Sequence, residues 1–165
     1  MPDEKSTAIC PGSYDPVTNG HIDIISRTAR IFDRVIVGVV NQPLRKQKTL
    51  FTPDERAGFI ERAVAEIGNV DVMVFSSLLV DFARENNAST IVKGLRAISD
   101  FEYEFEMNQL NRKLAPEIES AYVMASAEYS FLSSTGVKEL ATFGGDVRDL
   151  VPSEVAEALS ERIER

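Results

Sequence analysis

Short runs of apolar residues recur along the chain, separated by longer segments in which polar residues predominate. The runs cover residues 7–10, 35–40, 70–75, 90–92 and 120–125. Residues 35–40 are apolar throughout and mostly β-branched, a pattern typical of a strand that is buried on both faces. Each run has the length of a strand, so the pattern predicts five strands.

Between these runs the apolar positions recur every three or four residues, which predicts helices. Helices are expected over residues 21–33, 53–67, 78–85, 100–114 and 133–143, and from about residue 152 onward. The second is preceded by a strong start signal, in which Thr52 is the cap, Pro53 the first helical residue and Glu55 the acid. Ser99 is expected to cap the fourth, with Glu102 three residues later.

The alternation of strands and helices predicts the fold class. Five strands that alternate with helices are typical of an α/β protein with a doubly wound parallel sheet. A chain of 165 residues is long enough to bury a full core, so we expect one domain over residues 1–165. In this architecture ligands bind beyond the carboxyl ends of the strands.

Composition limits the kinds of binding partner and the cellular compartment that are expected. The formal net charge of −8 lacks the basic excess of a nucleic-acid-binding surface, so no nucleic-acid partner is expected. No apolar run approaches the roughly 18 residues of a membrane span, and the first residues do not resemble a signal peptide. The single cysteine, Cys10, cannot form an internal disulfide and is expected to be a buried core thiol. A cytoplasmic protein is therefore expected.

The stretch from Pro11 to His21 reads Pro-Gly-Ser-Tyr-Asp-Pro-Val-Thr-Asn-Gly-His and follows the first strand. Gly12 lies where that strand ends and Gly20 lies at the mouth of the next helix, where glycine would let a ligand approach the backbone. The amino end of a helix is an anion site, and phosphate is the usual anion. His21 would lie at the edge of that site.

Each of these signals also has a plain structural explanation. A lone histidine near a helix start is often only structural, and with no second histidine or cysteine cluster we expect no protein-bound metal. The basic segment with Arg45, Lys46 and Lys48 could be a solvated loop rather than a phosphate contact. Gly94 could permit a tight turn under an anion, or the segment could be an ordinary strand-end loop.

Two further segments have equally plain alternatives. The hydroxyls of residues 129–135 could bind phosphate, but capping a helix is their commoner use. Phe131, which lies within this segment, could equally well pack in the core or face a ligand. Residues 100–106 could be only an amphipathic helix with an acidic face.

The stretch from Pro11 to His21 resembles the phosphopantetheine adenylyltransferase family. This family belongs to the nucleotidylyltransferase superfamily, whose T/H-x-G-H signature matches residues 18–21. The resemblance covers nearly the whole chain. It implies a Rossmann-like fold and transfer of the adenylyl group of ATP to 4′-phosphopantetheine, giving dephospho-coenzyme A and pyrophosphate. It also implies Mg²⁺ bound with ATP, and a homohexamer.

The resemblance assigns roles residue by residue. His21 and Lys46 would be catalytic, with Arg45 the alternative to Lys46 because the loop before Phe51 is longer than the family pattern. Ser13 and Tyr14 would meet both substrates. Phosphopantetheine would be contacted by Leu79, Lys93 and the basic loop. ATP would be contacted by His21, Gly94, Leu95, Arg96, Glu104, Tyr129, Ser130, Phe131, Leu132, Ser133, Ser134 and Thr135.

Two other functions remain open at this point. One is a nucleotidylyltransferase with another acceptor, such as nicotinamide mononucleotide or glycerol phosphate. The strings Lys-Gly-Leu-Arg at 93–96 and Phe-Glu-Tyr-Glu at 101–104 argue against it. The other is a non-catalytic nucleotide-binding module, against which the intact His21 and the basic loop argue.

Overall fold

The computed structural model describes residues 5–44 and 48–163, with the side chains of all of these except 98 and 99. Its strands form one sheet in the order β3-β2-β1-β4-β5, and every neighbouring pair is parallel. The strands are β1 (Thr7–Gly12), β2 (Arg34–Val40), β3 (Val70–Phe75), β4 (Thr90–Leu95) and β5 (Glu119–Met124). This confirms the predicted five-stranded parallel α/β fold.

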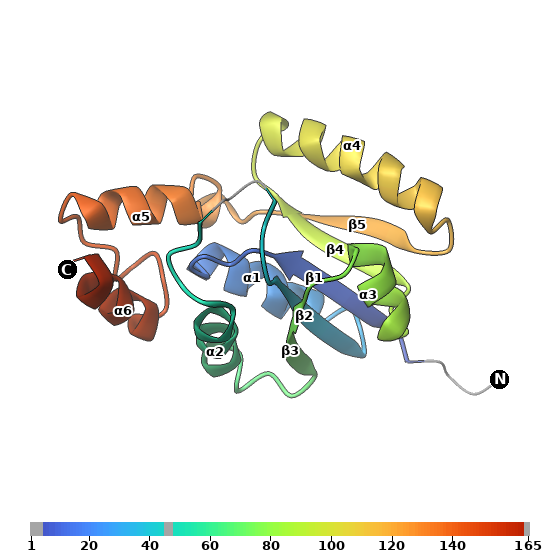
Figure 1. The fold of residues 1–165 in the computed structure, drawn as a ribbon, viewed down its shortest axis with the longest axis horizontal. Coiled ribbons are helices and arrows are strands. Elements are labelled where there is room, and N and C mark those ends of the chain that lie inside the picture. The colour runs from blue at the N-terminus through green and yellow to red at the C-terminus, as the bar shows by residue number, and fades with distance from the viewer. Residues whose placement is uncertain (1–4, 45–47, 164–165) are drawn as a thin grey trace.

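Helices connect the strands and follow the last one (Figure 1). They are α1 (Asn19–Thr28), α2 (Pro53–Ala63), α3 (Leu79–Glu85), α4 (Ile98–Leu114), α5 (Ser134–Thr142) and α6 (Ser153–Ile163), with the short 3-10 helix η1 (Ala127–Tyr129) before α5. The helix α4 lies along β5, while α5 and α6 lie together at the opposite end of the view from α3. None of the helices in the described ranges is both long enough and apolar enough to cross a membrane.

The central strands bury both of their faces. Val35, Val37 and Val39 of β2 point into a core cluster that also holds apolar residues of α1, α2, α5 and α6. Ile36, between them in sequence, points into a second cluster that holds residues of α3. Successive side chains of a strand point to opposite faces, so the apolar run of β2 is explained by a helical layer on each side.

Two of the predicted helix starts are confirmed. Thr52 caps α2: its hydroxyl accepts the Glu55 N–H, and the Glu55 carboxylate accepts the Thr52 N–H. Ser133 caps α5. The prediction for α4 is wrong, because this helix begins at Ile98 with Ala97 as its cap residue, so Ser99 lies inside the helix.

Helices α1 and α2 end earlier than their apolar periodicity predicts. The helix α1 ends at Thr28, and the chain continues through turns to Phe32, whose side chain still packs against the core. The Asn69 side chain donates to the carbonyl oxygens of Ala29 and Phe32, at 2.9 and 3.0 Å, and so satisfies groups that a longer helix would have paired. The apolar spacing therefore continues past the end of the hydrogen-bonded helix.

The strand β4 extends three residues further than expected and includes Lys93, Gly94 and Leu95. The expectation that Gly94 forms a tight turn is therefore wrong. A Cβ atom on Gly94 would lie 2.9 Å from Cγ1 of Ile24 in α1, closer than real side chains approach. The glycine is needed because α1 packs directly over the strand at this point.

Candidate active site

The strand order brings the candidate residues to one edge of the sheet. The strand β1 pairs with β2 on one side and β4 on the other, so the chain reverses its direction of winding at β1. Doubly wound folds bind ligands at such a switch point, beyond the carboxyl ends of the strands. Ser13 and His21 follow β1, and Lys93 to Leu95 form the carboxyl end of β4. These segments lie at the predicted place.

The imidazole of His21 is held by the cap of its own helix. Its Nδ1 atom accepts the backbone N–H of Thr18 at 2.9 Å, and the Thr18 hydroxyl lies 3.2 Å from the same atom. A ring nitrogen that accepts a backbone N–H carries no proton, so the neutral ring carries its proton on Nε2. The rings of Tyr14 and His21 form a T-shaped contact, with ring centres 5.0 Å apart. His21 therefore presents a defined N–H donor at the amino end of α1.

Tyr14 faces the interior of the protein. Its side chain is buried, and its hydroxyl donates to the Cys10 carbonyl oxygen at 2.9 Å. Burial raises the pKa of Tyr14 well above its ordinary value and raises the pKa of the Cys10 thiol to about 12. A Cβ on Gly12 would meet the Tyr14 ring at 2.9 Å, so this glycine accommodates a side chain of the protein itself. Cys10 is the buried thiol that the sequence predicts.

Gly20 also makes room for a neighbouring side chain. A Cβ there would lie 3.4 Å from the Cβ of Tyr129, which belongs to η1. The amino end of α1 and the segment after β5 therefore lie against each other, as a shared nucleotide site requires. Tyr129 and Ser130 are brought next to the His21 helix by this contact.

Lys93 and Glu104 form an ion pair between β4 and α4. Nζ of Lys93 donates to Oε2 of Glu104 at 2.6 Å, and the two side chains are only 18% and 17% exposed. The Tyr122 hydroxyl donates to the Glu104 backbone carbonyl at 3.2 Å. The structure thus brings together two residues to which the family resemblance gives different ligands.

Arg96 connects the end of β4 to the segment before α5. Its Nη1 donates to the Leu132 carbonyl oxygen at 2.7 Å, and its Nε pairs with Asp100 at 3.0 Å. Leu132 itself is buried in the core. The two segments that the resemblance assigns to ATP, 94–96 and 129–135, are therefore in direct contact.

Most of the hydroxyls just before α5 and in its first turn form hydrogen bonds with the protein's own backbone. The Ser133 side chain accepts the Gly136 N–H at 3.0 Å, which is the capping role weighed above. The buried Ser134 donates to the Pro16 carbonyl oxygen at 2.8 Å, and Ser130 donates to its own 3-10 turn at Ala127. Thr135 is exposed.

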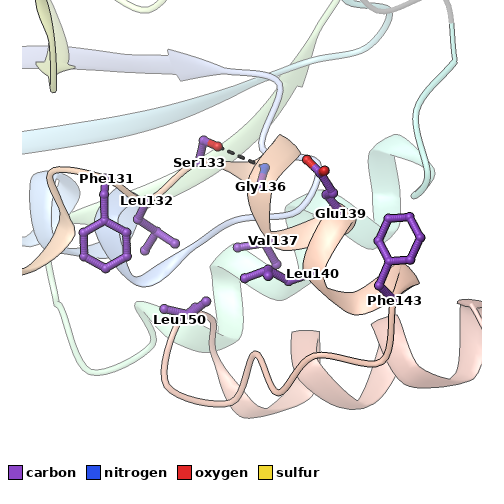
Figure 2. Close-up of a pocket in the computed structure, with 9 residues that line it drawn as sticks. All are labelled: Phe131, Leu132, Ser133, Gly136, Val137, Glu139, Leu140, Phe143 and Leu150. Atoms are coloured by element: carbon purple, nitrogen blue, oxygen red, sulfur yellow. Dashed lines mark hydrogen bonds between the residues drawn. The ribbon is translucent and has the colours of Figure 1, made fainter.

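Phe131 is 74% exposed and lies at one end of an apolar hollow of about 300 Å³ (Figure 2). The other lining residues include Val137, Leu140, Phe143 and Leu150 of α5 and the segments after it. Few polar groups line this hollow, so it does not have the chemistry of a triphosphate site.

The remaining assigned residues are Leu79 and those of the basic loop. Leu79 begins α3, after the edge strand β3, and its half-buried side chain packs against the second core cluster. Arg45 and Lys46 lie outside the described residues, while Lys48 is exposed. The choice between Arg45 and Lys46 stays a prediction.

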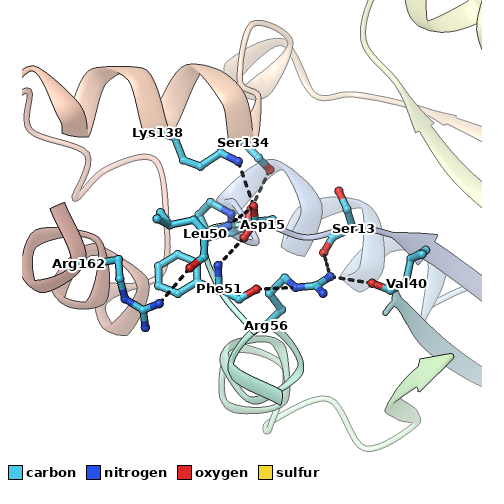
Figure 3. A network of polar contacts seen from close by, with 10 residues as sticks. Ser13, Asp15, Val40, Leu50, Phe51, Arg56, Ser134, Lys138 and Arg162 are labelled. Atoms are coloured by element: carbon cyan, nitrogen blue, oxygen red, sulfur yellow. Dashed lines mark hydrogen bonds and ion pairs between the residues drawn. The ribbon is translucent and has the colours of Figure 1, made fainter. Parts of the chain in front are cut away.

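Three charged residues without a predicted role lie in the turn after β1 or contact it (Figure 3). Asp15 and Arg56 are completely buried, and Lys138 donates to the Asp15 carboxylate at 3.0 Å. Asp15 lies within residues 11–21, which resemble the family. This position is the only feature of the sequence that could have drawn attention to it. Arg56 and Lys138 lie in helices where charged residues are usually solvated, so periodicity does not distinguish them.

Within the described ranges, no three His, Cys, Asp or Glu side chains gather as a metal site would require. The expectation of Mg²⁺ carried by ATP concerns a different arrangement and is not tested by this finding. Mg²⁺ commonly takes one or two carboxylates and completes its shell with phosphate oxygens and water.

Comparison with known proteins identifies the family. Residues 9–140 match the cytidylyltransferase-like family. The chain is 50% identical over 155 residues to the phosphopantetheine adenylyltransferase of Clostridium tetani, covering 94% of this chain and 96% of that protein. It is 55% identical over 152 residues to the phosphopantetheine adenylyltransferase of Rubrobacter xylanophilus, covering 92% of each.

A solved structure supports the fold. A bifunctional NMN adenylyltransferase/ADP ribose pyrophosphatase from Francisella tularensis superposes with a TM-score of 0.69 at 16% identity, over 98% of this chain. The chain spans 50% of that longer protein, and at this identity the likeness concerns the fold alone. Taken with the sequence relatives, these findings show that the chain belongs to the phosphopantetheine adenylyltransferase family.

Proposed function

We propose that this chain transfers the adenylyl group of ATP to 4′-phosphopantetheine, giving dephospho-coenzyme A and pyrophosphate, a step of coenzyme A synthesis. The observation that carries the proposal is the identity of 50% and 55% with proteins named for this activity, over 94% and 92% of the chain. The enzyme would therefore be a pantetheine-phosphate adenylyltransferase.

The reaction needs positioning and charge stabilisation rather than a protein nucleophile. An oxygen of the acceptor phosphate attacks the α-phosphorus of ATP, and the bond from that phosphorus to the bridging oxygen of pyrophosphate breaks. Negative charge develops on the oxygens around the α-phosphorus. The Nε2–H of His21 and the amino end of α1 are fixed donors for that charge.

A second cation and an acceptor contact complete the proposal. Lys46 would neutralise charge on the transferred phosphate, by resemblance. Lys93, together with Ser13, would hold the acceptor phosphate, and its present partner is the Glu104 carboxylate. Mg²⁺ would arrive with the triphosphate and shield its charge. Phosphate oxygens and water would supply most of its ligands.

We further propose a homohexamer in the cytoplasm. Phe101, Phe105, Leu110 and Leu114 of α4 are each more than half exposed, and such apolar surface favours contact with another protein surface. A single cysteine suits a reducing compartment.

An acceptor panel tests the activity. Purified protein with ATP and Mg²⁺ is given 4′-phosphopantetheine, pantetheine, nicotinamide mononucleotide or glycerol phosphate, and pyrophosphate release is measured with product identification. Only 4′-phosphopantetheine should support turnover. Pantetheine is the matched control, because it lacks only the attacking phosphate. Turnover with a different acceptor would reassign the substrate, and ATP binding without any turnover would favour a non-catalytic module.

A further inference from the structure

A fully buried carboxylate lies in the turn between β1 and α1. Oδ1 of Asp15 accepts the Phe51 N–H at 2.9 Å, and Oδ2 accepts the Leu50 N–H at 2.9 Å and the Lys138 ammonium at 3.0 Å (Figure 3). Burial alone would raise the pKa of Asp15, but these donors and the charge of Lys138 bring it below its ordinary 3.8. The side chain is therefore an ionised carboxylate at neutral pH.

A buried guanidinium holds the same region from another side. Arg56 of α2 is completely buried, and burial lowers its pKa from the ordinary value. It donates to four backbone carbonyl oxygens at 2.7 to 3.2 Å, those of Ser13, Val40, Asn41 and Phe51. These carbonyls belong to the turn after β1, to the end of β2 and the residue that follows it, and to the segment just before α2.

Asp15, Arg56 and Lys138, which we call the buried network, therefore join the turn at 13–16 to β2, α2 and α5. The Ser134 hydroxyl adds a further contact by donating to the Pro16 carbonyl oxygen at 2.8 Å. Groups from α2, from α5 and from the segment before α2, all far away in sequence, thus hold a turn of four residues.

The turn lies directly against His21. The Tyr14 ring makes a T-shaped contact with the imidazole, and the Thr18 N–H donates to Nδ1. Tyr14 also has a φ angle of +48°, a left-handed conformation that costs a bulky residue on the order of 1 kcal/mol or more. Such a conformation persists where surrounding contacts impose it, and strain of this kind gathers at functional sites.

Stability alone is a poor explanation for the buried network. Removing charges from water costs several kcal/mol each, so buried ions are weak evidence of net stabilisation. The rate of a reaction depends far more strongly on how a donor is oriented, because a displacement of about 1 Å can lower the rate by roughly a hundredfold.

We propose that the buried network positions the turn before α1 and, through Tyr14 and Thr18, orients the imidazole of His21 for adenylyl transfer. Asp15, Arg56 and Lys138 are positioning residues in this view, since they act through His21. The inference rests on the proposed function of His21.

A double-mutant cycle tests the link to His21. Asp15→Asn and Lys138→Met are each made in the wild-type and in the His21→Ala background, and kcat and KM are measured with ATP and 4′-phosphopantetheine. In the wild-type background each should lower kcat by about tenfold or more and change KM for ATP by less than about threefold. In the His21→Ala background each should lower kcat by less than about twofold. Equal losses of kcat in both backgrounds would overturn the proposal.

The ring of His21 gives a second readout that needs no turnover. His21 is the only histidine of the chain, so selective ¹⁵N labelling yields one imidazole in a long-range ¹H–¹⁵N spectrum. The wild-type protein should show the Nε2–H tautomer. Asp15→Asn and Lys138→Met should shift these signals or mix in the other tautomer, and unchanged signals would refute the positioning role. If the wild-type protein turns over no acceptor, the proposed function fails while this spectrum still decides the inference.

A stability control separates positioning from loss of fold. Ile118→Ala removes buried packing in the second core cluster, away from the turn. At a matched loss of Tm it should leave kcat and the His21 signals unchanged, whereas an equal fall in kcat would assign the effects to stability. The Lys138 side chain is 24% exposed, so Lys138→Met should disturb the fold less. This variant decides the test if Asp15→Asn does not fold.

Discussion

His21 is held by two residues of its own motif: Thr18 donates to Nδ1, and Tyr14 makes a T-shaped ring contact. A donor preorganised in this way acts on charge that develops in the transition state. His21→Ala should therefore lower kcat by about 10²–10³ and leave ATP affinity, measured by calorimetry, much less affected. Near-normal turnover would remove His21 from the catalytic role.

Lys93 is the residue proposed for the acceptor phosphate. Its ammonium is already paired with Glu104 and only slightly exposed, so it is desolvated and oriented before a ligand binds. Lys93→Ala should raise KM for phosphopantetheine more than KM for ATP in steady-state assays. Lys93→Arg keeps the charge and should be milder. An equal rise in both KM values would place this residue on the wrong substrate.

Asp15 should make stability depend on acid pH. Its pKa lies below the ordinary 3.8 in the folded state, so its stabilising contribution is complete above that pH and is lost as the pH falls through the folded value. The difference in free energy of unfolding between wild type and Asp15→Asn should be constant above about pH 5 and decrease in more acidic solution, by about 1.4 kcal/mol for each unit of lowered pKa. Urea unfolding at a series of pH values measures it, and a difference independent of pH would contradict the assignment.

At the scale of elements, the packing of α1 on β4 depends on a missing side chain. A Cβ at residue 94 would lie 2.9 Å from Cγ1 of Ile24, so Gly94→Ala should force the helix and strand apart and lower stability by about 1–3 kcal/mol. Ile24→Ala removes the obstructing atoms. The double variant Gly94→Ala/Ile24→Ala should therefore lose less stability in urea than the sum of the single variants. Strict additivity would show that this contact is not the reason for the glycine.

At the scale of the whole molecule, α4 leaves four large apolar side chains more than half exposed. Its exposed apolar side chains, Phe101, Phe105, Leu110 and Leu114, lie outside both core clusters. Multi-angle light scattering at micromolar protein should give six times the chain mass of 18.3 kDa. Phe105→Glu, which places a charge on this face, should lower the measured mass, and Phe131→Glu is the matched exposed control. A wild-type mass near that of one chain would refute the hexamer.

The sequence by itself determined the order of strands and helices and the burial of β2 on both faces, because apolar periodicity is a local property. It also indicated the start of α2, since Thr52 and Glu55 bond to each other within one turn. Residues 11–21 indicated the family, because the residues of this motif are consecutive in the sequence and need no tertiary contact to be recognised.

Only the tertiary structure decided where elements end and which charges are buried. The strand β4 continues through Gly94 while α1 packs over it. The helix α1 ends at Thr28, and Asn69, 40 residues away from Ala29, donates to the Ala29 carbonyl oxygen just beyond that end. The partner of Asp15 is Lys138, 123 residues further along the chain. Apolar spacing does not reveal such pairs, because the free energy of a buried charge depends on donors that only folding brings to it.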